Sequence, residues 1–250
     1  MTSTLNIAAY RFVALTDLQD WRARIRAQAE ACALKGTVLL AGEGINLCLA
    51  GTEANVRRWL GWLQAQEPFT ALEVKESHSA DVPFGKLRVK VKPEIIRMNH
   101  AAVQPQAGRA PSVDATTLAR WLAQGTDDAG RPLAMLDTRN AFEADAGRFR
   151  GAIDWRIERF SEFPEALLAH RTELAGKTVV SYCTGGIRCE KAALFMASAG
   201  VANVLQLEGG ILTYFEQTGG EHFDGDCFVF DARTTLDAGL CPTASAASGP

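Results

Sequence analysis

Apolar and polar residues alternate in some stretches of the chain, and apolar residues recur every three or four positions in others. Alternation predicts strands, and the longer spacing predicts amphipathic helices. The first hundred residues give, in order, a strand (6–15), a helix (18–32), a hairpin (37–41 and 45–50), a second helix (53–65) and two strands (72–77 and 86–96). This order is close to the split β-α-β pattern of a ferredoxin-like α+β sandwich.

The second half of the chain has a different pattern. Residues 133–137 and 179–182 are nearly continuous apolar runs, which are typical of buried parallel strands, and 190–199 has helical spacing. Ser112 or Asp114 can cap a helix that runs through Trp121. We therefore predict an α/β protein in four parts: a ferredoxin-like domain (1–97), a linker (98–111), a domain with a mostly parallel sheet (112–220), and an irregular extension (221–250) whose last ten residues are disordered.

Composition narrows the class of protein. The 250 residues are 47% hydrophobic and contain no twenty-residue apolar run and no signal peptide, so we expect a soluble, cytoplasmic protein with no membrane contact. Six cysteines in so core-rich a chain are read as thiols. The four histidines are scattered, no C-x-x-C pair occurs and no G-x-G-x-x-G spacing is present, so neither a metal nor a flavin is evident.

The net charge of −3 is unevenly divided. Residues 1–110 hold 14 Lys and Arg against 10 Asp and Glu, and the remainder is acidic. Within 86–92 the even positions are all cationic and the odd ones apolar, which places the four charges on one face of a strand: Lys86, Arg88, Lys90 and Lys92. Two interpretations stay open, an edge strand whose charges prevent aggregation and a surface that faces RNA.

The segment 179–191 carries the chemistry. An apolar strand ends at Cys183 and continues into a predicted loop of Thr184, Gly185, Gly186, Ile187 and Arg188, which leads into a helix. Two glycines let backbone N–H groups turn inward, and a helix N-terminus adds positive potential, so the loop favours an anion. We expect a nucleophilic thiolate at Cys183 with a pKa below the usual one. The alternative is a small buried hydrophobic side chain.

The spacing and neighbouring motifs resemble the rhodanese family. Four residues separate Cys183 from Arg188, one fewer than in cysteine phosphatases, so the loop suits a sulfur-sized group. Residues 133–140 end in Asp-Thr-Arg-Asn and resemble a second signature of that family, and 204–211 resemble its last strand. We expect Asp137 and Arg139 to form a buried ion pair with a supporting role rather than a chemical one.

A more specific resemblance covers the chain to about residue 233. The runs 35–46, 84–96, 137–140, 182–191 and 225–231 are similar to the TrhO family of bacterial tRNA uridine hydroxylases. That resemblance implies oxygen-dependent formation of 5-hydroxyuridine at the wobble position (34) of tRNA, with Cys183 required, molecular oxygen as co-substrate and the tRNA anticodon region as partner. No obligate protein partner is evident.

The mechanism and the function class stay open on the sequence alone. Cys183 either adds directly to the uracil ring or carries a persulfide. The alternative function is a thiosulfate or persulfide sulfurtransferase, which leaves the basic strand without a role, and a third is a non-catalytic RNA-binding module that senses oxidants. Cys189, next to Arg188, is either a resolving thiol or a packing residue.

Overall fold

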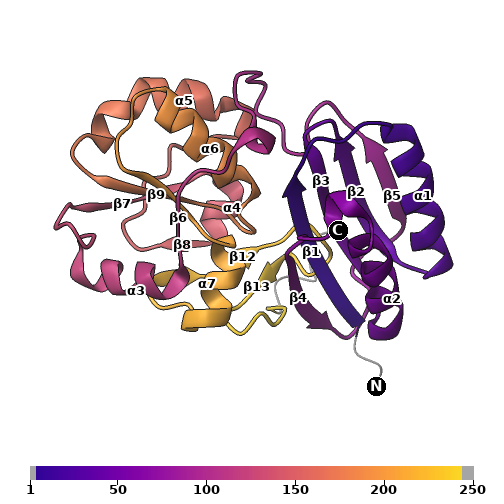
Figure 1. Ribbon diagram of the computed structural model, residues 1–250. Helices are drawn as coiled ribbons and strands as arrows, with labels where there is room; N and C mark the ends of the chain where they lie inside the picture. The colour runs from indigo at the N-terminus through magenta and orange to yellow at the C-terminus, as the bar shows by residue number, and fades with distance from the viewer. Residues whose placement is uncertain (1–3, 244–250) are drawn as a thin grey trace. The chain divides into compact units, whose positions relative to one another are not determined.

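The computed structural model describes residues 4–243, which form two compact units. The first unit holds residues 4–97 together with the short segment Asp231–Arg233, and the second holds Met98–Phe230 and residues 234–243. Figure 1 shows that each unit has its own sheet and its own helices. Each therefore has its own core.

The first unit is an α+β sandwich of the predicted kind. Its sheet has the order β4-β1-β3-β2-β5, in which β5 runs parallel to β2 and the other neighbours are antiparallel. The elements are β1 (Thr4–Phe12), α1 (Leu18–Ala31), β2 (Lys35–Ala41), β3 (Gly44–Thr52), α2 (Glu53–Gln64), the 3₁₀ turn η1 (Glu67–Phe69), β4 (Val74–Ser79) and β5 (Leu87–Val91).

One face of this sheet forms the core of the first unit. Figure 1 shows α1 and α2 on the same side of the sheet. Val38 and Val89, which are partners across β2 and β5, join Ile25 of α1 and Trp59 of α2 in one buried cluster. Because side chains alternate along a strand, the polar residues next to Val89 point away from the two helices.

The second unit is built on a parallel sheet of order β6-β10-β9-β7. Its 3₁₀ turns are η2 (Pro105–Ala107), η3 (Phe160–Glu162) and η4 (Arg171–Leu174). Its other elements up to residue 218 are β6 (Ser112–Val113), α3 (Ala115–Gln124), β7 (Leu133–Asp137), α4 (Ala141–Ala146), β8 (Gly147–Phe149), α5 (Phe163–His170), β9 (Thr178–Tyr182), α6 (Ile187–Ser198), β10 (Val204–Leu207) and α7 (Gly210–Thr218).

Helices lie on both faces of this sheet. Helices α3 and α7 lie together on one side and α5 and α6 on the other (Figure 1). Strand β9 is buried along its whole length, because it is central and covered on both faces. Of the two residues proposed to cap α3, Asp114 does so, and its side chain accepts a hydrogen bond from the N–H of Thr117 at 2.8 Å.

Two segments carry more structure than the sequence suggested. In the segment expected to be a linker, Met98, Val103 and Ala110 are buried, and the whole segment belongs to the second unit. Beyond residue 220, where an irregular extension was expected, short strands pair with β8 or with each other: β11 (Phe223–Gly225), β12 (Cys227–Phe228) and β13 (Thr235–Leu236). Isolated apolar residues anchor these segments, and such spacing leaves no periodic signal in the sequence.

The segment Asp231–Arg233 is also held by specific contacts. Arg233 forms an ion pair with Asp231 at 2.6 Å and donates a hydrogen bond to the Ser77 hydroxyl of β4 at 2.7 Å, within the first unit. The disorder expected for the last ten residues concerns positions that, from 244 on, lie outside the described residues.

Candidate active site

Cys183 follows β9 directly, at the carboxyl end of the parallel sheet where open α/β sheets bind ligands. The turn after it is tight: Gly186 has φ +102° and is the N-cap of α6. The helix begins at Ile187, so Ile187 and Arg188, which the sequence analysis placed in the loop, lie in its first helical turn. The glycine permits this early start because a left-handed backbone costs it nothing.

The sulfur of Cys183 is held by neighbouring polar groups. The N–H of Gly186 donates a hydrogen bond to Sγ at 3.1 Å, and Sγ of Cys189 lies 3.9 Å away. Cys189 also donates to the carbonyl oxygen of Gly186 at 2.9 Å. Both thiols are fully buried. The loop therefore encloses a sulfur atom with donors directed at it, which is the arrangement that stabilises a thiolate.

The electrostatics agree with this geometry. Burial acts to raise the pKa of Cys183, but hydrogen bonding from the Cys189 thiol, the positive charge of Arg188 and the N–H groups of Cys189 and Arg188 outweigh burial and lower the pKa to about 5. Burial and the nearby Cys183 raise the pKa of Cys189 well above its usual value. One thiol of the pair is therefore ionised at neutral pH and the other is protonated.

Arg188 has a partner that the sequence analysis did not assign. Its guanidinium makes two hydrogen bonds of 2.6 Å to the carboxylate of Glu143, which belongs to α4. Both side chains are buried. Arg188 is therefore not a free cation. Its guanidinium is the positive end of a fixed ion pair with Glu143, and its charge acts on Cys183 from that position.

The second motif lies beside this pair. Asp137 and Arg139 form the expected ion pair, 2.6 Å between Oδ2 and Nη2, and neither side chain is exposed. Arg139 also donates to the carbonyl oxygens of Gly147 at 2.6 Å and of Glu143 at 3.3 Å. These bonds fix the backbone of α4 and thereby the carboxylate that holds Arg188.

The start of α7 holds the loop that begins at Cys183. The N–H of Ile211 donates to the carbonyl oxygen of Cys183 at 2.9 Å, and that of Leu212 donates to Thr184 at 3.1 Å. Gly210, with φ +68°, packs against the loop so closely that a Cβ there would lie 2.5 Å from the carbonyl oxygen of Cys183 and 2.8 Å from the nitrogen of Gly186. Only glycine fits this position without moving the loop.

The remaining loop residues are partly exposed. Thr184 and Gly185 are half-buried, and the Thr184 hydroxyl donates to the carbonyl oxygen of Phe228 in β12 at 3.4 Å. The described extension beyond residue 220 thus touches the loop.

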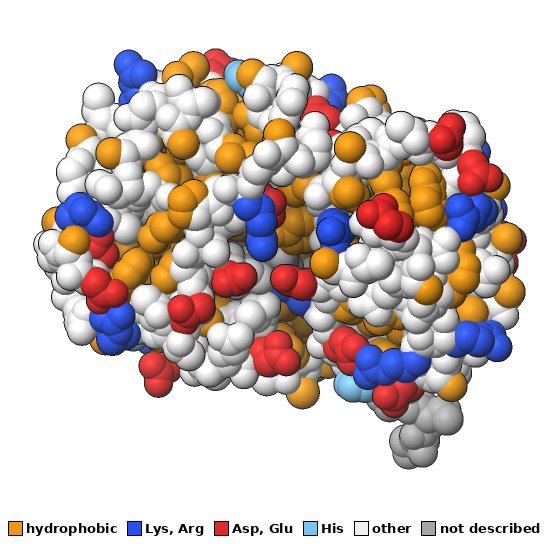
Figure 2. Space-filling model, in the orientation of Figure 1, with side chains coloured by type: hydrophobic (Ala, Val, Ile, Leu, Met, Phe, Trp, Pro, Cys, Tyr) orange, Lys and Arg blue, Asp and Glu red, His pale blue; other side chains and the backbone are white. Residues whose placement is uncertain are grey.

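Of the predicted basic strand (86–96), residues 87–91 form β5, at an edge of the first sheet, and Lys86 and Lys92 lie immediately outside it. All four cations are exposed, whereas Val89 between them is buried. A shallow depression of about 230 Å³ beside the strand is lined by Lys90 and Lys92 together with Gln19 and Arg22 of α1. The geometry fits both open interpretations, since an edge strand is also where protective charges are found. Figure 2 shows basic and acidic side chains interspersed over the visible face of the molecule.

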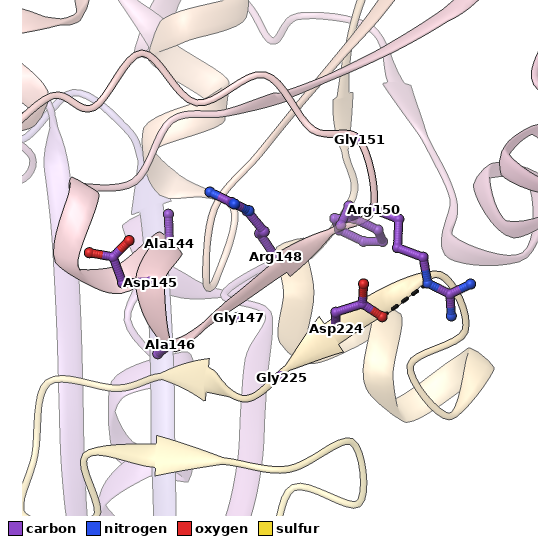
Figure 3. A pocket seen from close by; sticks show the side chains of 10 residues that line it. Ala144, Asp145, Ala146, Gly147, Arg148, Arg150, Gly151, Asp224 and Gly225 are labelled. Atoms are coloured by element: carbon purple, nitrogen blue, oxygen red, sulfur yellow. Dashed lines mark hydrogen bonds and ion pairs between the residues drawn. The ribbon is translucent and has the colours of Figure 1, made fainter.

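A larger depression of about 520 Å³ lies on the second unit and is lined by residues 144–151 with Asp224 and Gly225. Figure 3 shows Arg148 and Arg150 at its wall, with Arg150 bonded to Asp224 at 3.0 Å. Arg148 lies 3.6 Å from Asp154. Because both cations have acidic partners and Cys183 is not among the lining residues, we assign no catalytic role to this depression.

Within residues 4–243, no three His, Cys, Asp or Glu side chains are grouped as metal ligands would be. None of the helices in that range is both long and apolar enough to cross a membrane.

Comparison with known proteins agrees with both units. Residues 4–95 match the model of the UPF0176 acylphosphatase like domain, and residues 116–217 match that of the Rhodanese-like domain. Over nearly its whole length the chain is similar to proteins named tRNA uridine(34) hydroxylase. It is 62% identical to that of Bordetella petrii over 99% of this chain and 98% of the relative, and 63% identical to that of Bordetella avium over 96% and 99%.

The chain belongs to the tRNA uridine(34) hydroxylase family. A third relative, from Variovorax paradoxus, is 60% identical over 99% of this chain and 94% of its own length. The resemblance to this family and the α/β fold class, both expected from the sequence, are confirmed.

For this family member, sequence reasoning missed two structural parts of the site. Glu143 follows the Asp-Thr-Arg-Asn run, but nothing local shows that its carboxylate reaches Arg188, 45 residues further on. Gly210 belongs to a Gly-Gly pair, which predicts a turn, but the sequence does not show that the backbone of the Cys183 loop packs against it. Both depend on long-range contacts.

Proposed function

We propose that this protein hydroxylates C5 of the wobble uridine of tRNA, with Cys183 as the nucleophile and molecular oxygen as co-substrate. The observation that carries the proposal is the buried sulfur of Cys183 at a strand end, which accepts a hydrogen bond from the N–H of Gly186 at 3.1 Å and lies 3.9 Å from Sγ of Cys189, in a chain of the tRNA uridine(34) hydroxylase family. Because tRNA is its substrate, we also propose that the protein acts in the cytoplasm.

The chemistry follows from the electronic structure of uracil. Carbon C6 is electrophilic, so addition of the Cys183 thiolate there pushes electrons to C5 and O4 as an enolate. The enolate can then attack oxygen at C5. One oxygen atom stays as the C5 hydroxyl and the other leaves as water, so the reaction consumes two electrons from a reductant. Loss of the C5 proton and departure of the thiolate from C6 restore the ring.

A thiol is the chemical class of reductant closest to the reacting sulfur. Cys189 lies 3.9 Å from Cys183. Once the thiolate has left C6, a disulfide between the Cys183 thiolate and the Cys189 thiol would supply two electrons and one proton, and the second proton would come from solvent. Cys189 also packs in the interior of the unit. The short distance to Cys183 supports a resolving thiol, and the burial supports a packing residue, so both interpretations of Cys189 stay open.

The buried state of Cys183 has a consequence for binding. The side chain has no exposed surface, so a nucleobase reaches Sγ only after neighbouring atoms move. The base itself must leave its stack in the anticodon loop. We propose that Lys86, Arg88, Lys90 and Lys92 hold the RNA backbone while this happens, since exposed cations spaced along a strand suit phosphates.

The rhodanese loop also supports a rival chemistry. A loop that directs an N–H group at one sulfur can also stabilise a persulfide, so sulfur transfer from thiosulfate or a persulfide donor is the second candidate function. Sulfur transfer needs no oxygen and no tRNA. Intact mass spectrometry of the resting enzyme tests the persulfide: a stoichiometric extra sulfur that turnover requires would contradict direct addition of the thiolate.

The decisive experiment compares tRNA from a deletion strain that carries either the wild-type gene or the Cys183→Ser variant. Nucleoside mass spectrometry measures 5-hydroxyuridine. The proposal expects the nucleoside only with wild type. Equal amounts with both genes, or none with either, would make sulfur transfer the leading account.

A further inference from the structure

Three phenylalanines form a partly exposed cluster on the second unit. The side chains of Phe142 and Phe230 are 46% and 63% exposed, and that of Phe228 is half-buried. The rings meet edge to face, with centroids 5.2 Å apart for Phe142 and Phe228, 5.2 Å for Phe228 and Phe230, and 6.3 Å for Phe142 and Phe230. We call these three residues the phenylalanine cluster.

This exposure is unusual within the molecule. Among residues 4–243 the exposed large hydrophobic side chains are Val82, Phe142, Leu168 and Phe230, and the two aromatic ones are in the same cluster. Single exposed apolar residues need no explanation, but contiguous exposed rings cost solvation free energy and often mark a binding site. Core packing does not explain the exposure of these rings, because packing in the core would bury them.

The phenylalanine cluster adjoins the catalytic loop through two of its members. The carbonyl oxygen of Phe228 accepts the hydrogen bond from Thr184, the residue after Cys183. Phe142 precedes Glu143, whose carboxylate holds Arg188. The backbone of Phe228 is therefore bonded to the loop that begins at Cys183, and Phe142 is the neighbour in sequence of the carboxylate that holds Arg188.

The chemistry of the rings selects the class of ligand. An edge-to-face contact occupies the face of one ring and the edge of the other, so exposed Phe142 and Phe230 keep ring surface for a flat partner. Nucleobases stack on aromatic side chains in this way, largely without regard to sequence. A uridine that leaves its stack to reach Cys183 unstacks its neighbours too, and these need a new surface.

We propose that Phe142 and Phe230 form a stacking site for an anticodon-loop nucleobase next to the uridine that Cys183 modifies. The inference rests on the proposed function. The stacking site would act in addition to the contacts proposed between the cations of β5 and the RNA backbone. It would be an uncharged contact that keeps the anticodon loop open. Phe228 contacts the rings of Phe142 and Phe230 and thereby positions them.

The test measures the affinity of unmodified tRNA for Phe142→Ala, Phe230→Ala and the double variant. Because stacking contributes about 1–3 kcal/mol per base, we expect each single variant to bind about 5- to 150-fold more weakly. The dependence of log Kd on log salt should keep its slope, since no charge is removed. The turnover number at saturating tRNA should stay within a few fold.

Leu168→Ala is the matched control, because Leu168 is a 56% exposed apolar residue in α5 of the same unit. It should bind tRNA like wild type. Phe142→Trp and Phe230→Trp keep a stacking face and should keep the affinity for tRNA. Phe142→Leu and Phe230→Leu keep only apolar surface and should lose that affinity. Thermal unfolding checks that each variant is folded.

Two outcomes separate the inference from the function on which it rests. If wild type forms 5-hydroxyuridine and folded Phe142→Ala/Phe230→Ala binds tRNA within about twofold of the Leu168→Ala control, the stacking site is wrong and the hydroxylase proposal stands. A double variant that loses thermal stability but keeps the affinity would likewise show that the rings are structural. If wild type forms no 5-hydroxyuridine with any tRNA, the proposed function itself fails.

Discussion

The site around Cys183 and the strand β5 use charge in opposite ways. Near Cys183 the charged groups are buried and paired, Arg188 with Glu143 and Arg139 with Asp137. The four cations of residues 86–92, two in β5 and two immediately beside it, are exposed, and no ion pair described within residues 4–243 includes them. Buried pairs fix geometry, and exposed cations attract a polyanion in a salt-dependent way. Changes at the first region should therefore alter the rate, and changes at the second the affinity for RNA.

The largest effect is expected from adding one carbon atom beneath the loop. Gly210→Ala places a Cβ 2.5 Å from the carbonyl oxygen of Cys183 at φ +68°, so the loop must shift. A displacement of about 1 Å at a reacting group can cost about 100-fold in rate, and we expect a decrease of that size with little change in tRNA affinity. Single-turnover formation of 5-hydroxyuridine measures it.

Gly176→Ala is the control for this substitution. Gly176 also has a positive φ, +73°, but nothing lies within 4 Å of the position of its Cβ. Both variants introduce backbone strain of the order of 1 kcal/mol, but only Gly210→Ala makes a steric clash with the loop that begins at Cys183. Equal activity of the two variants would show that the contact beneath Cys183 has no role in catalysis.

The second effect concerns RNA binding. Reversing the charge of Lys86, Arg88 and Lys90 together should weaken tRNA binding by at least about 10-fold. It should also reduce the slope of log Kd against log salt by about 0.7–0.9 for each phosphate that the variant no longer neutralises. The rate at saturating tRNA should be unchanged. Fluorescence anisotropy titrations at several salt concentrations measure both the affinity and the slope.

The same change of charge elsewhere on the first unit separates a local contact from general electrostatics. Arg24 and Arg26 on α1 and Arg57 on α2 belong to the helices that cover the opposite face of the sheet. Reversal of these three should affect tRNA binding much less. If both triple variants bind equally, β5 is an edge strand protected by charge and not an RNA contact.

The third effect is the pH dependence of Cys183. Its pKa is lowered to about 5, so the thiolate is populated above that pH and disappears as pH falls through it. The rate of alkylation at Cys183, followed by peptide mass spectrometry, should be level near neutrality and fall towards pH 5. Because the Cys189 thiol helps to lower the pKa, Cys189→Ala should move the midpoint to higher pH.

Restricted access to the buried sulfur lowers the rate of alkylation at every pH but does not change the pH at which the rate is half-maximal. The pH of the midpoint therefore reports the pKa of Cys183. Cys32→Ala removes a buried thiol of the first unit and should leave the curve unchanged. A wild-type midpoint near the roughly 8.5 of a free thiol would show that the neighbours of Cys183 do not stabilise its thiolate.

The smallest effect tests stability. Asp114 caps α3, and hydrogen bonds from the Thr116 hydroxyl and the Thr117 N–H lower its pKa to about 2. Asp114→Ala should cost about 0.5–2 kcal/mol of unfolding free energy and leave activity intact well below Tm. Thr52→Ala is the control, since Thr52 makes no side-chain capping bond to α2. Equal Tm values for the two variants would contradict the assignment of the cap.

The sequence predicts what local patterns determine. The alternation in 86–92 predicted which side chains of β5 are exposed, and the apolar run before Cys183 placed the cysteine at a strand end. Local chemistry also named Asp114 as one of two candidate caps, with Ser112, and the structure shows that Asp114 is the cap. These features depend on neighbours within a few residues, whose preferences are strong enough to survive folding.

What the sequence did not predict depends on contacts between distant segments. Glu143 reaches Arg188 only because α4 and α6 meet in the folded unit, and Gly210 supports Cys183 only because β10 lies beside β9. The strands after residue 220 are two or three residues long, too short for a periodic signal, and they position Phe228. Tertiary packing decides such features.

The central claim, oxygen insertion that depends on Cys183, is tested most directly with purified protein and unmodified tRNA under ¹⁸O₂. The account predicts that wild type forms 5-hydroxyuridine heavier by one ¹⁸O atom and that Cys183→Ser, although it binds tRNA equally well, forms none. Unlabelled product in ¹⁸O₂, or labelled product from the Cys183→Ser variant, would contradict it.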